Sequence, residues 1–145
     1  MITTFQYKLD PTKAVAAKLL RTLDICRELY NAALEERRDA YKRCRVYVTR
    51  AMQSAQLPDL KRVRPDVAEV HSQVLQEVLG RLDLAFQSFF RRLREHQKAG
   101  FPRFKGKDRY DSFTFPQGGW KLSGATLKLS GIGLAKIRMS RPLGG

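Results

Sequence analysis

The sequence predicts an α+β protein in which a block of helices is inserted into a β-structure. Three observations support this. Residues 2–9 alternate in polarity as a short strand does, and residues 11–99 carry apolar side chains at three- and four-residue steps. After Gly100, short strand-like pieces are separated by glycine turns. The simplest architecture joins the first strand to the late strands in one sheet or barrel.

The first long helix is predicted to start after Asp10 and Pro11, which supply an N-cap candidate and a first-turn proline. It is expected to run to about Arg43, and the pattern allows a kink near residues 22–24. Its apolar face repeats at three- and four-residue steps. The residues on that face are Val15, Leu19, Leu23, Cys26, Leu29, Tyr30, Ala33, Leu34 and Arg37.

A shorter helix is predicted over residues 49–56, ended by Pro58 because the residue before a proline resists the helical conformation. Residues 58–65 are expected to form a basic connector. A second long helix is then predicted from Pro65 or Asp66 to about Ala99. Its buried face would contain Val67, Val70, Val74, Val78, Leu82, Ala85, Phe86, Phe89 and Leu93.

Strands are predicted over residues 111–116, 119–122, 125–130 and 133–139, with glycine-containing turns between them. Trp120 is expected to anchor the core or the rim of a barrel. Cys26 and Cys44 are the two cysteines, and both are predicted to be buried free thiols in helices. This usage favours a cytoplasmic setting.

The charge of the chain indicates a polyanionic partner. Lys and Arg total 28 against 14 Asp and Glu, a net charge of +14. Nucleic acid is the usual partner for such an excess. An anionic membrane is the main competitor, but the basic residues do not follow the pattern of an interfacial helix. The sequence has neither an apolar run of membrane-spanning length nor the pattern of a signal peptide.

Residues 100–117 mix cations with aromatic rings. Four cations (Arg103, Lys105, Lys107 and Arg109) alternate with the rings of Phe101, Phe104, Tyr110, Phe113 and Phe115. Cations neutralise phosphates and rings stack on bases, so the stretch suits a nucleic-acid surface. A solvated basic loop whose rings pack locally is the alternative.

No catalytic site, metal site or cofactor site is predicted within this chain. Asp66, Glu69 and His71 lie near one another in sequence, but their spacing matches no metal-binding motif. Two helical cysteines cannot form a four-ligand zinc site. Whether the chain takes part in an enzyme is left open by these residues alone.

Three pieces of sequence together resemble the TnpB family of transposon-encoded RNA-guided DNA nucleases, relatives of type V CRISPR effectors. The first is FQYKLDPT at residues 5–12 with LYNAALE at 29–35. The second is GFPRFK at 100–105 with SFTFPQ at 112–117. The third is LKL at 127–129 and GLAKI at 133–137, leading into RPL at 141–143. The resemblance covers nearly all of this chain but only the N-terminal third or so of a family member.

The resemblance implies an oligonucleotide-binding β-barrel, called the wedge, interrupted by a helical recognition lobe. The wedge portion would comprise residues 1–10 and 100–145, and the lobe residues 11–99. It also implies a guide RNA from the transposon end and a target DNA duplex as partners. The family's RuvC-like nuclease domain, with its divalent metals, would lie outside this chain, so a separate RuvC-like nuclease chain is a further candidate partner.

The resemblance also implies contact residues. The target-adjacent motif of the duplex would be read where the lobe meets the wedge, by Arg50, Ser54, Gln73, Gln76, Ser112, Phe113 and Thr114. Glutamine, serine and threonine can bond to base edges. Phosphate or guide-RNA contacts are expected from Tyr7, Lys8, Arg103, Lys105, Lys107, Arg109, Lys121, Lys128, Lys136 and Arg138. The alternative for the glutamines is a plain solvent-facing role, and for the strand cations an ordinary strand surface.

The chain is therefore interpreted as the nucleic-acid-binding portion of a TnpB-like protein, either naturally truncated or split, or the N-terminal segment of an intact nuclease. Two rivals stay open. One is a stand-alone regulator that binds duplex DNA through a helix-turn-helix module without RNA, although these helices exceed a usual recognition unit. The other is a decayed transposon fragment with general RNA affinity.

Overall fold

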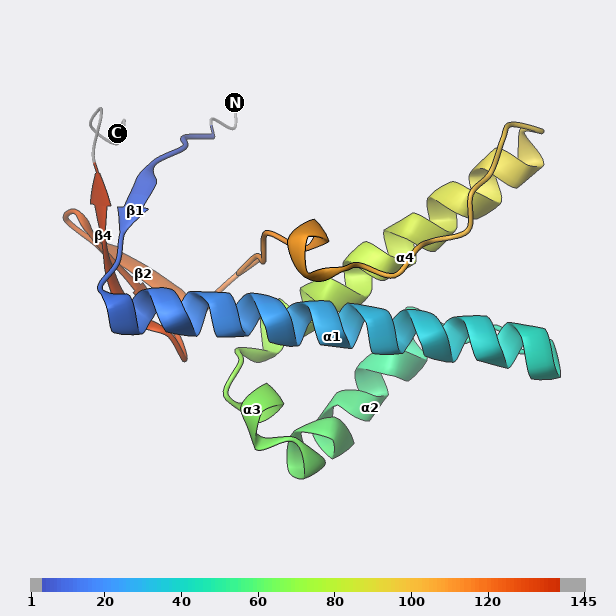
Figure 1. The fold of residues 1–145 in the computed structure, drawn as a ribbon, viewed down its shortest axis with the longest axis horizontal. Coiled ribbons are helices and arrows are strands. Elements are labelled where there is room, and N and C mark those ends of the chain that lie inside the picture. The colour runs from blue at the N-terminus through green and yellow to red at the C-terminus, as the bar shows by residue number, and fades with distance from the viewer. Residues whose placement is uncertain (1–3, 139–145) are drawn as a thin grey trace.

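A computed structural model describes residues 4–138 of the chain, and Figure 1 shows a small sheet at one end and extended helices leading away from it. The strands are β1 (Lys8–Asp10), β2 (Trp120–Ser123), β3 (Thr126–Leu129) and β4 (Gly133–Arg138). The helices are α1 (Lys13–Cys44), α2 (Arg50–Val63), α3 (Pro65–Ala68) and α4 (Ser72–Arg94), with a 3₁₀ turn over Lys107–Arg109. The predicted α+β class and its β–α–β order are confirmed.

The N-terminal strand pairs with the last strand, as the sequence predicts. The sheet order is β1-β4-β3-β2, every pair is antiparallel, and Leu9 lies opposite Ile137. Within residues 4–138 the sheet has two open edges, β1 and β2, and is not a closed barrel. Of the predicted strand over residues 2–9, residues 2 and 3 lie outside the described part, and only Lys8 and Leu9 are in β1.

The predicted strand over residues 111–116 is wrong. That stretch has no strand partner, because Phe113 and Phe115 pack against the helical core instead of against the sheet. The three later strands lie within two residues of their predicted bounds. Residue 139, at the end of the last predicted strand, lies outside the described residues.

Helix α1 is a single unbroken helix of 32 residues without the kink that the sequence allows. Its N-cap is Thr12, not Asp10: the Thr12 hydroxyl accepts a hydrogen bond from the Val15 amide at 3.3 Å. The helix ends where Arg45 adopts a left-handed conformation with φ 53°. The amide of Arg45 then closes the last turn on the carbonyl oxygen of Tyr41.

Helix α2 continues past Pro58, so the predicted stop at residue 57 and the basic connector over residues 58–65 are wrong. Pro58 is exposed, whereas Leu57 is 5% exposed and Leu60 packs against the core. The burial of these two leucines offsets the backbone hydrogen bond that the proline cannot donate.

The predicted second long helix is two helices. The chain bends at residues 69–71 between α3 and α4, and the His71 ring nitrogen Nδ1 caps α4 by accepting from the Gln73 amide at 3.2 Å. Helix α4 ends at Arg94, not at Ala99, and Gly100 is not its stop. His96 instead takes the left-handed conformation that ends the helix, with φ 55°.

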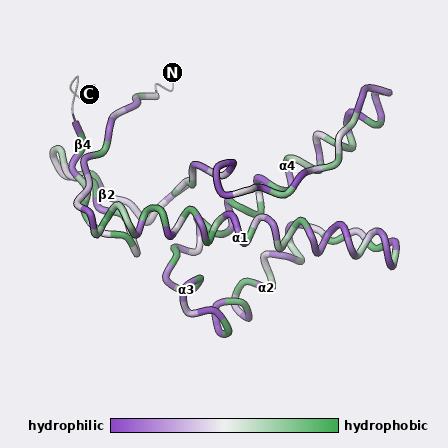
Figure 2. The backbone as a smooth tube through the Cα atoms, viewed as in Figure 1, coloured by the Kyte–Doolittle hydropathy of each residue, from purple (hydrophilic) through white to green (hydrophobic). Residues whose placement is uncertain are grey.

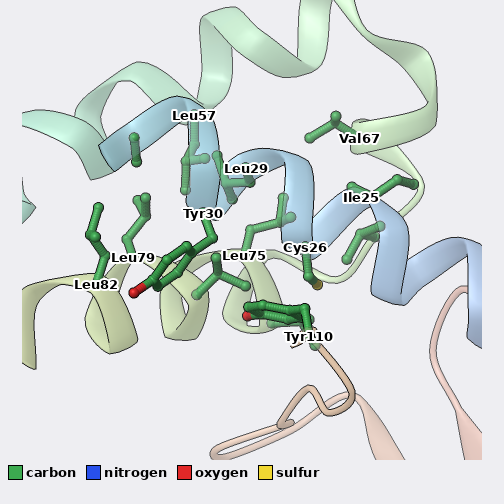
Figure 3. Close-up of a cluster of buried hydrophobic side chains, with 14 of the residues drawn as sticks. Ile25, Cys26, Leu29, Tyr30, Leu57, Val67, Leu75, Leu79, Leu82 and Tyr110 are labelled. Atoms are coloured by element: carbon green, nitrogen blue, oxygen red, sulfur yellow. The ribbon is translucent and has the colours of Figure 1, made fainter. Parts of the chain in front are cut away.

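The core lies where the helices cross. In Figure 3 the side chains of Cys26 and Tyr30 from α1, Leu57 from α2, and Leu75 from α4 converge on one another. Figure 2 shows hydrophobic and hydrophilic residues alternating along α1 and α4. In the described part of the chain, no helix combines the length and apolar composition that a membrane span requires.

Five predicted burials need correction. Cys44 is exposed near the end of α1, although Cys26 is fully buried. Trp120 is 52% exposed at the start of β2 and does not anchor a core. Ala85 and Phe89 are only half-buried and Leu93 is 50% exposed. The distal half of α4 diverges from α1 (Figure 1), and the Phe101 ring covers only part of it. Arg37 is buried on the apolar face, as predicted.

Gly131 joins the sheet to the turn between α3 and α4, and Gly131→Ala is expected to destabilise the fold by roughly 3 kcal/mol. Its φ is 77°, and an added Cβ would lie 2.5 Å from the Glu69 carbonyl oxygen, a backbone atom that cannot rotate away. Urea unfolding would measure the loss. Gly124 is the matched control, since it has φ 58° but open space around it. Gly124→Ala should cost about 1 kcal/mol, and equal losses would contradict the proposed clash.

Candidate nucleic-acid interface

Residues 100–118, called the return segment below, run from the tip of α4 back towards the sheet (Figure 1). Its aromatic rings fix it to the helices. The Phe101 ring packs edge-on against Phe86 and Phe89, with 5.3 Å between ring centroids in each case. Tyr110 packs against Tyr30 at 5.9 Å and is itself buried.

Asn31 of α1 fixes the middle of the return segment. Its side-chain amide donates to the Lys105 carbonyl oxygen at 2.9 Å and accepts from the Lys105 amide at 2.7 Å. One asparagine therefore satisfies both backbone groups of a residue 74 positions away. This contact joins the LYNAALE and GFPRFK pieces of the sequence, and the sequence pattern did not reveal it.

Three rings of the return segment, those of Tyr110, Phe113 and Phe115, pack against the helices. Phe101 and Phe104 are 37% and 44% exposed, and most cations of the segment lie outward. Arg103, Lys107 and Arg109 are exposed. Lys105 is half-buried, with its ammonium nitrogen 5.8 Å from the centre of the Tyr30 ring. Local ring packing, the alternative weighed for this stretch, therefore coexists with a row of solvent-facing cations.

Two side chains of α4 hold the end of the return segment. The Gln73 amide oxygen accepts from the amides of Gln117 at 3.3 Å and Gly118 at 2.8 Å. Two turns later, Arg81 donates to the Ser112 carbonyl oxygen at 2.8 Å and to the Thr114 hydroxyl at 3.3 Å. Arg81 was not among the predicted site residues, yet it positions two of them.

Glu77 in turn orients Arg81, accepting from its Nε at 2.7 Å. Phe113, between Ser112 and Thr114, is half-buried against the helical core. Its ring is 6.0 Å from that of Phe115. Phe113 therefore fixes the loop, while Ser112 and Thr114 on either side of it are exposed.

Gln73→Ala is expected to loosen residues 117–118 without unfolding the protein, at a cost of about 1–2 kcal/mol for the two hydrogen bonds that it removes. Hydrogen exchange at the Gln117 and Gly118 amides should become faster. Gln76→Ala is the matched control, because Gln76 is exposed on the same helix and its side chain makes no contact with these amides. Equal exchange in both variants would contradict the clamping role.

The remaining predicted motif readers, Arg50, Ser54 and Gln76, lie where α2 meets α4. Arg50 is the first residue of α2, and its guanidinium group lies over Gly80 of α4. It also donates to the Gln76 carbonyl oxygen at 3.5 Å. Ser54 is half-buried one turn further along α2. The structure thus groups Arg50 with Gln76, and Gln73 with the return segment.

The sheet gathers five of the predicted cations on one face. Lys8 lies directly opposite Arg138, and Lys121 directly opposite Lys128. Lys128 lies directly opposite Leu134, and Lys136 and Arg138 follow Leu134 at two-residue steps. Side chains that are directly opposite each other, or two residues apart on one strand, lie on the same face of the sheet. We call these five residues the basic face: Lys8, Lys121, Lys128, Lys136 and Arg138. All five are exposed.

One acidic residue accompanies the basic face, since Asp10 lies opposite Lys136. The opposite side of the sheet is apolar, with Leu129 and Ala135 buried. Tyr7 precedes β1 and is half-buried, with its ring 6.3 Å from that of Phe5. The basic face is therefore a flat, solvated, cationic surface on a β-scaffold.

Burial keeps the Cys26 thiol and the Tyr110 hydroxyl in their neutral forms. Burial raises the pKa of the Cys26 thiol to about 12, and burial likewise raises the pKa of the Tyr110 hydroxyl. A thiol in this state is a poor nucleophile and serves as a small apolar side chain.

Two of the three residues considered for metal binding, Asp66 and His71, have other partners. Arg64 donates to both carboxylate oxygens of Asp66, at 3.0 and 2.6 Å, and these bonds lower the pKa of Asp66 to about 2. His71 caps α4. Among residues 4–138, no group of three or more His, Cys, Asp or Glu side chains could hold a metal ion.

Known proteins match this chain along nearly its whole length. Residues 1–46 match a family model described as a helix-turn-helix domain, HTH_OrfB_IS605. A Streptomyces pristinaespiralis protein named "Putative RNA-guided DNA endonuclease" is 33% identical over 96% of this chain and 34% of its own length. The Escherichia coli K12 protein "Putative RNA-guided DNA endonuclease InsQ" is 28% identical over 99% of this chain and 35% of its own length.

These matches define the class as that of transposon-encoded proteins related to RNA-guided endonucleases. The chain belongs to the TnpB family and corresponds to the N-terminal part of its members, as the three pieces of sequence indicate. It spans about a third of the length of the curated relatives that it matches. Within the residues that match the helix-turn-helix model, the described part contains β1 and the single continuous helix α1.

Proposed function

We propose that this chain is the nucleic-acid-binding portion of a TnpB-like RNA-guided DNA-targeting protein. The observation that carries the proposal is the basic face. Five exposed cations from four strands share one side of the sheet with a single acidic residue. A flat array of lysines on a β-scaffold suits the phosphates of a folded RNA, which are read by position and shape and not by sequence.

In this proposal the basic face and the adjoining Tyr7 bind the guide RNA. The exposed cations of the return segment, Arg103, Lys107 and Arg109, contact phosphates together with Lys105. The sheet would form part of a wedge-type barrel built from residues 1–10 and 100–145, and the helices of residues 11–99 would form the recognition lobe. The names of the relatives support an RNA partner and a DNA partner.

The target-adjacent motif of duplex DNA would be engaged along α4. Exposed Gln76 and the neighbouring Arg50 and Ser54 form one group of candidate contacts. Ser112 and Thr114, held by Arg81, form a second. The amides of Gln117 and Gly118 in the return segment already donate to the amide oxygen of Gln73. The Gln73 side chain would therefore contact a base through its amide nitrogen, as a hydrogen-bond donor only.

We do not assign cleavage of the target DNA to this chain. In the proposed assembly a RuvC-like nuclease, on another part of a longer protein or on a separate chain, supplies the catalytic carboxylates and divalent metal. This chain would then position RNA and DNA and break no bond itself.

Gel shifts with transposon-end RNA and with duplex DNA test the proposal. We expect salt-sensitive RNA binding, and motif-dependent duplex binding only when the RNA is present. Sequence-specific duplex binding without RNA would instead favour the stand-alone helix-turn-helix regulator that the family model's description suggests. Failure to bind RNA at low ionic strength would overturn the proposal.

A further inference from the structure

An aromatic pocket lies between the distal ends of α1 and α4, at the end of the molecule away from the sheet (Figure 1). Its cavity volume is about 410 Å³, within the range of about 300–1,000 Å³ that ligand sites span. Six aromatic rings line it. They belong to Tyr41, Tyr47, Phe86, Phe89, Phe90 and Phe101.

The rings form a connected surface that is open to solvent. Tyr47 is central to it, with its ring centroid 5.3 Å from that of Tyr41 and 6.2 Å from that of Phe90. Tyr47 is 63% exposed and Tyr41 is 38% exposed. These ring faces are therefore available to stack with a flat partner.

Cations border the rings. The pocket is lined by four cations, and by no acidic residue of the part of the chain that the structure describes. The cations are Arg37, Arg38, Lys42 and Arg45. Arg45 holds its place through a left-handed backbone conformation, which is uncommon for a residue other than glycine, and its guanidinium lies 5.2 Å from the centre of the Tyr41 ring. The pocket thus offers stacking surfaces within reach of positive charge.

We propose that the aromatic pocket binds one unpaired nucleotide of a bound RNA, a site additional to the basic face. The base stacks on Tyr47 and its neighbours, while Lys42 and Arg45 contact the flanking phosphates. This inference rests on the proposed function, because it assumes that the chain binds RNA. Stacking on aromatic rings beside cations is how proteins hold unpaired bases without reading their sequence.

Charge decides against a second copy of this chain as the occupant. A partner copy would bring the same cations to the same place and would itself carry a net charge of +14. An acidic peptide with an apolar anchor would satisfy the charge. The predominance of rings among the lining residues favours a flat aromatic ligand, and the peptide is one outcome of the test.

The test uses the full chain and an oligo(U) RNA that carries one 2-aminopurine. Uracils stack only weakly on the probe in the free RNA, so its fluorescence falls when it stacks on a protein ring. Wild-type protein should quench the probe. Tyr47→Ala should weaken binding about tenfold and abolish most of the quenching, whereas Tyr47→Trp, which keeps a ring, should preserve both. Leu20→Ala is the matched control, because Leu20 is 64% exposed on α1 and does not line the pocket.

The outcomes separate this inference from the proposed function. If wild type binds the RNA but Tyr47→Ala binds and quenches equally well, the pocket assignment is wrong and RNA binding by the basic face stands. If wild type binds no RNA at low ionic strength, both fail. Loss of binding to an acidic, leucine-containing peptide in Tyr47→Ala, with unchanged RNA binding, would assign the pocket to a polypeptide instead.

Discussion

Replacing both Lys128 and Lys136 by glutamate is expected to weaken binding of transposon-end RNA roughly hundredfold at 0.1 M salt. The two residues lie on the same side of adjacent strands, at the centre of the basic face. Removing one phosphate interaction lowers the slope of log affinity against log salt by about 0.9, so removing two accounts for about 60-fold between 1 M and 0.1 M salt. The introduced carboxylates add repulsion.

Fluorescence anisotropy across a salt series would measure both the affinity and the slope. Lys61→Glu combined with Arg62→Glu is the matched control, since both residues lie in the last turn of α2 and belong neither to the basic face nor to the lining of the aromatic pocket. The change in net charge is the same. A control that loses as much affinity as the sheet variant would show that total charge, and not the basic face, governs binding.

Arg37→Ala is expected to destabilise the fold by about 3 kcal/mol, near the lower end of the range for breaking a buried ion pair because Asp83 is 26% exposed. Arg37 links three helices. It donates to Gln53 of α2 at 2.9 Å and to Asp83 of α4 at 3.1 Å, and its guanidinium lies 5.1 Å from the centre of the Phe86 ring. Its removal leaves buried polar groups without partners.

The free energy of unfolding in guanidinium chloride would measure this loss. Arg43→Ala removes an exposed arginine from the same helix and should change stability by less than about 0.5 kcal/mol. A double-mutant cycle with Gln53→Ala should show coupling, because Arg37 donates to the Gln53 amide oxygen at 2.9 Å. Additive losses would indicate that the network contributes nothing beyond packing.

The sequence predicted the structure best where a regular pattern of apolar residues extends over many residues. The extent of α1 and the inward position of Arg37 followed from three- and four-residue steps, and the strand alternation placed the five cations in the right strands. Their sharing of one face required the register between strands, which depends on pairings between β1 and β4 more than 120 residues apart.

Predictions failed where distant contacts overrule a local signal. Pro58 is a strong stop in isolation, but the buried leucines beside it keep α2 helical. For the rings of the return segment the sequence left two interpretations open. Tyr110 and Phe113 pack against the helices, and stacking of the segment's rings on bases stays a prediction. The roles of Asn31 and Arg81 depend on partners that no local pattern identifies.

The unbroken course of α1 sets a length scale for whatever binds. A straight helix of 32 residues measures about 48 Å, and α1 begins beside the sheet and ends at the aromatic pocket. A transcript that touches both ends must therefore bridge a distance equal to roughly 14 stacked base steps. A fully stacked transcript shorter than this can reach either end of α1 but not both, so RNA that spans the two ends with fewer nucleotides has to be unstacked along the way.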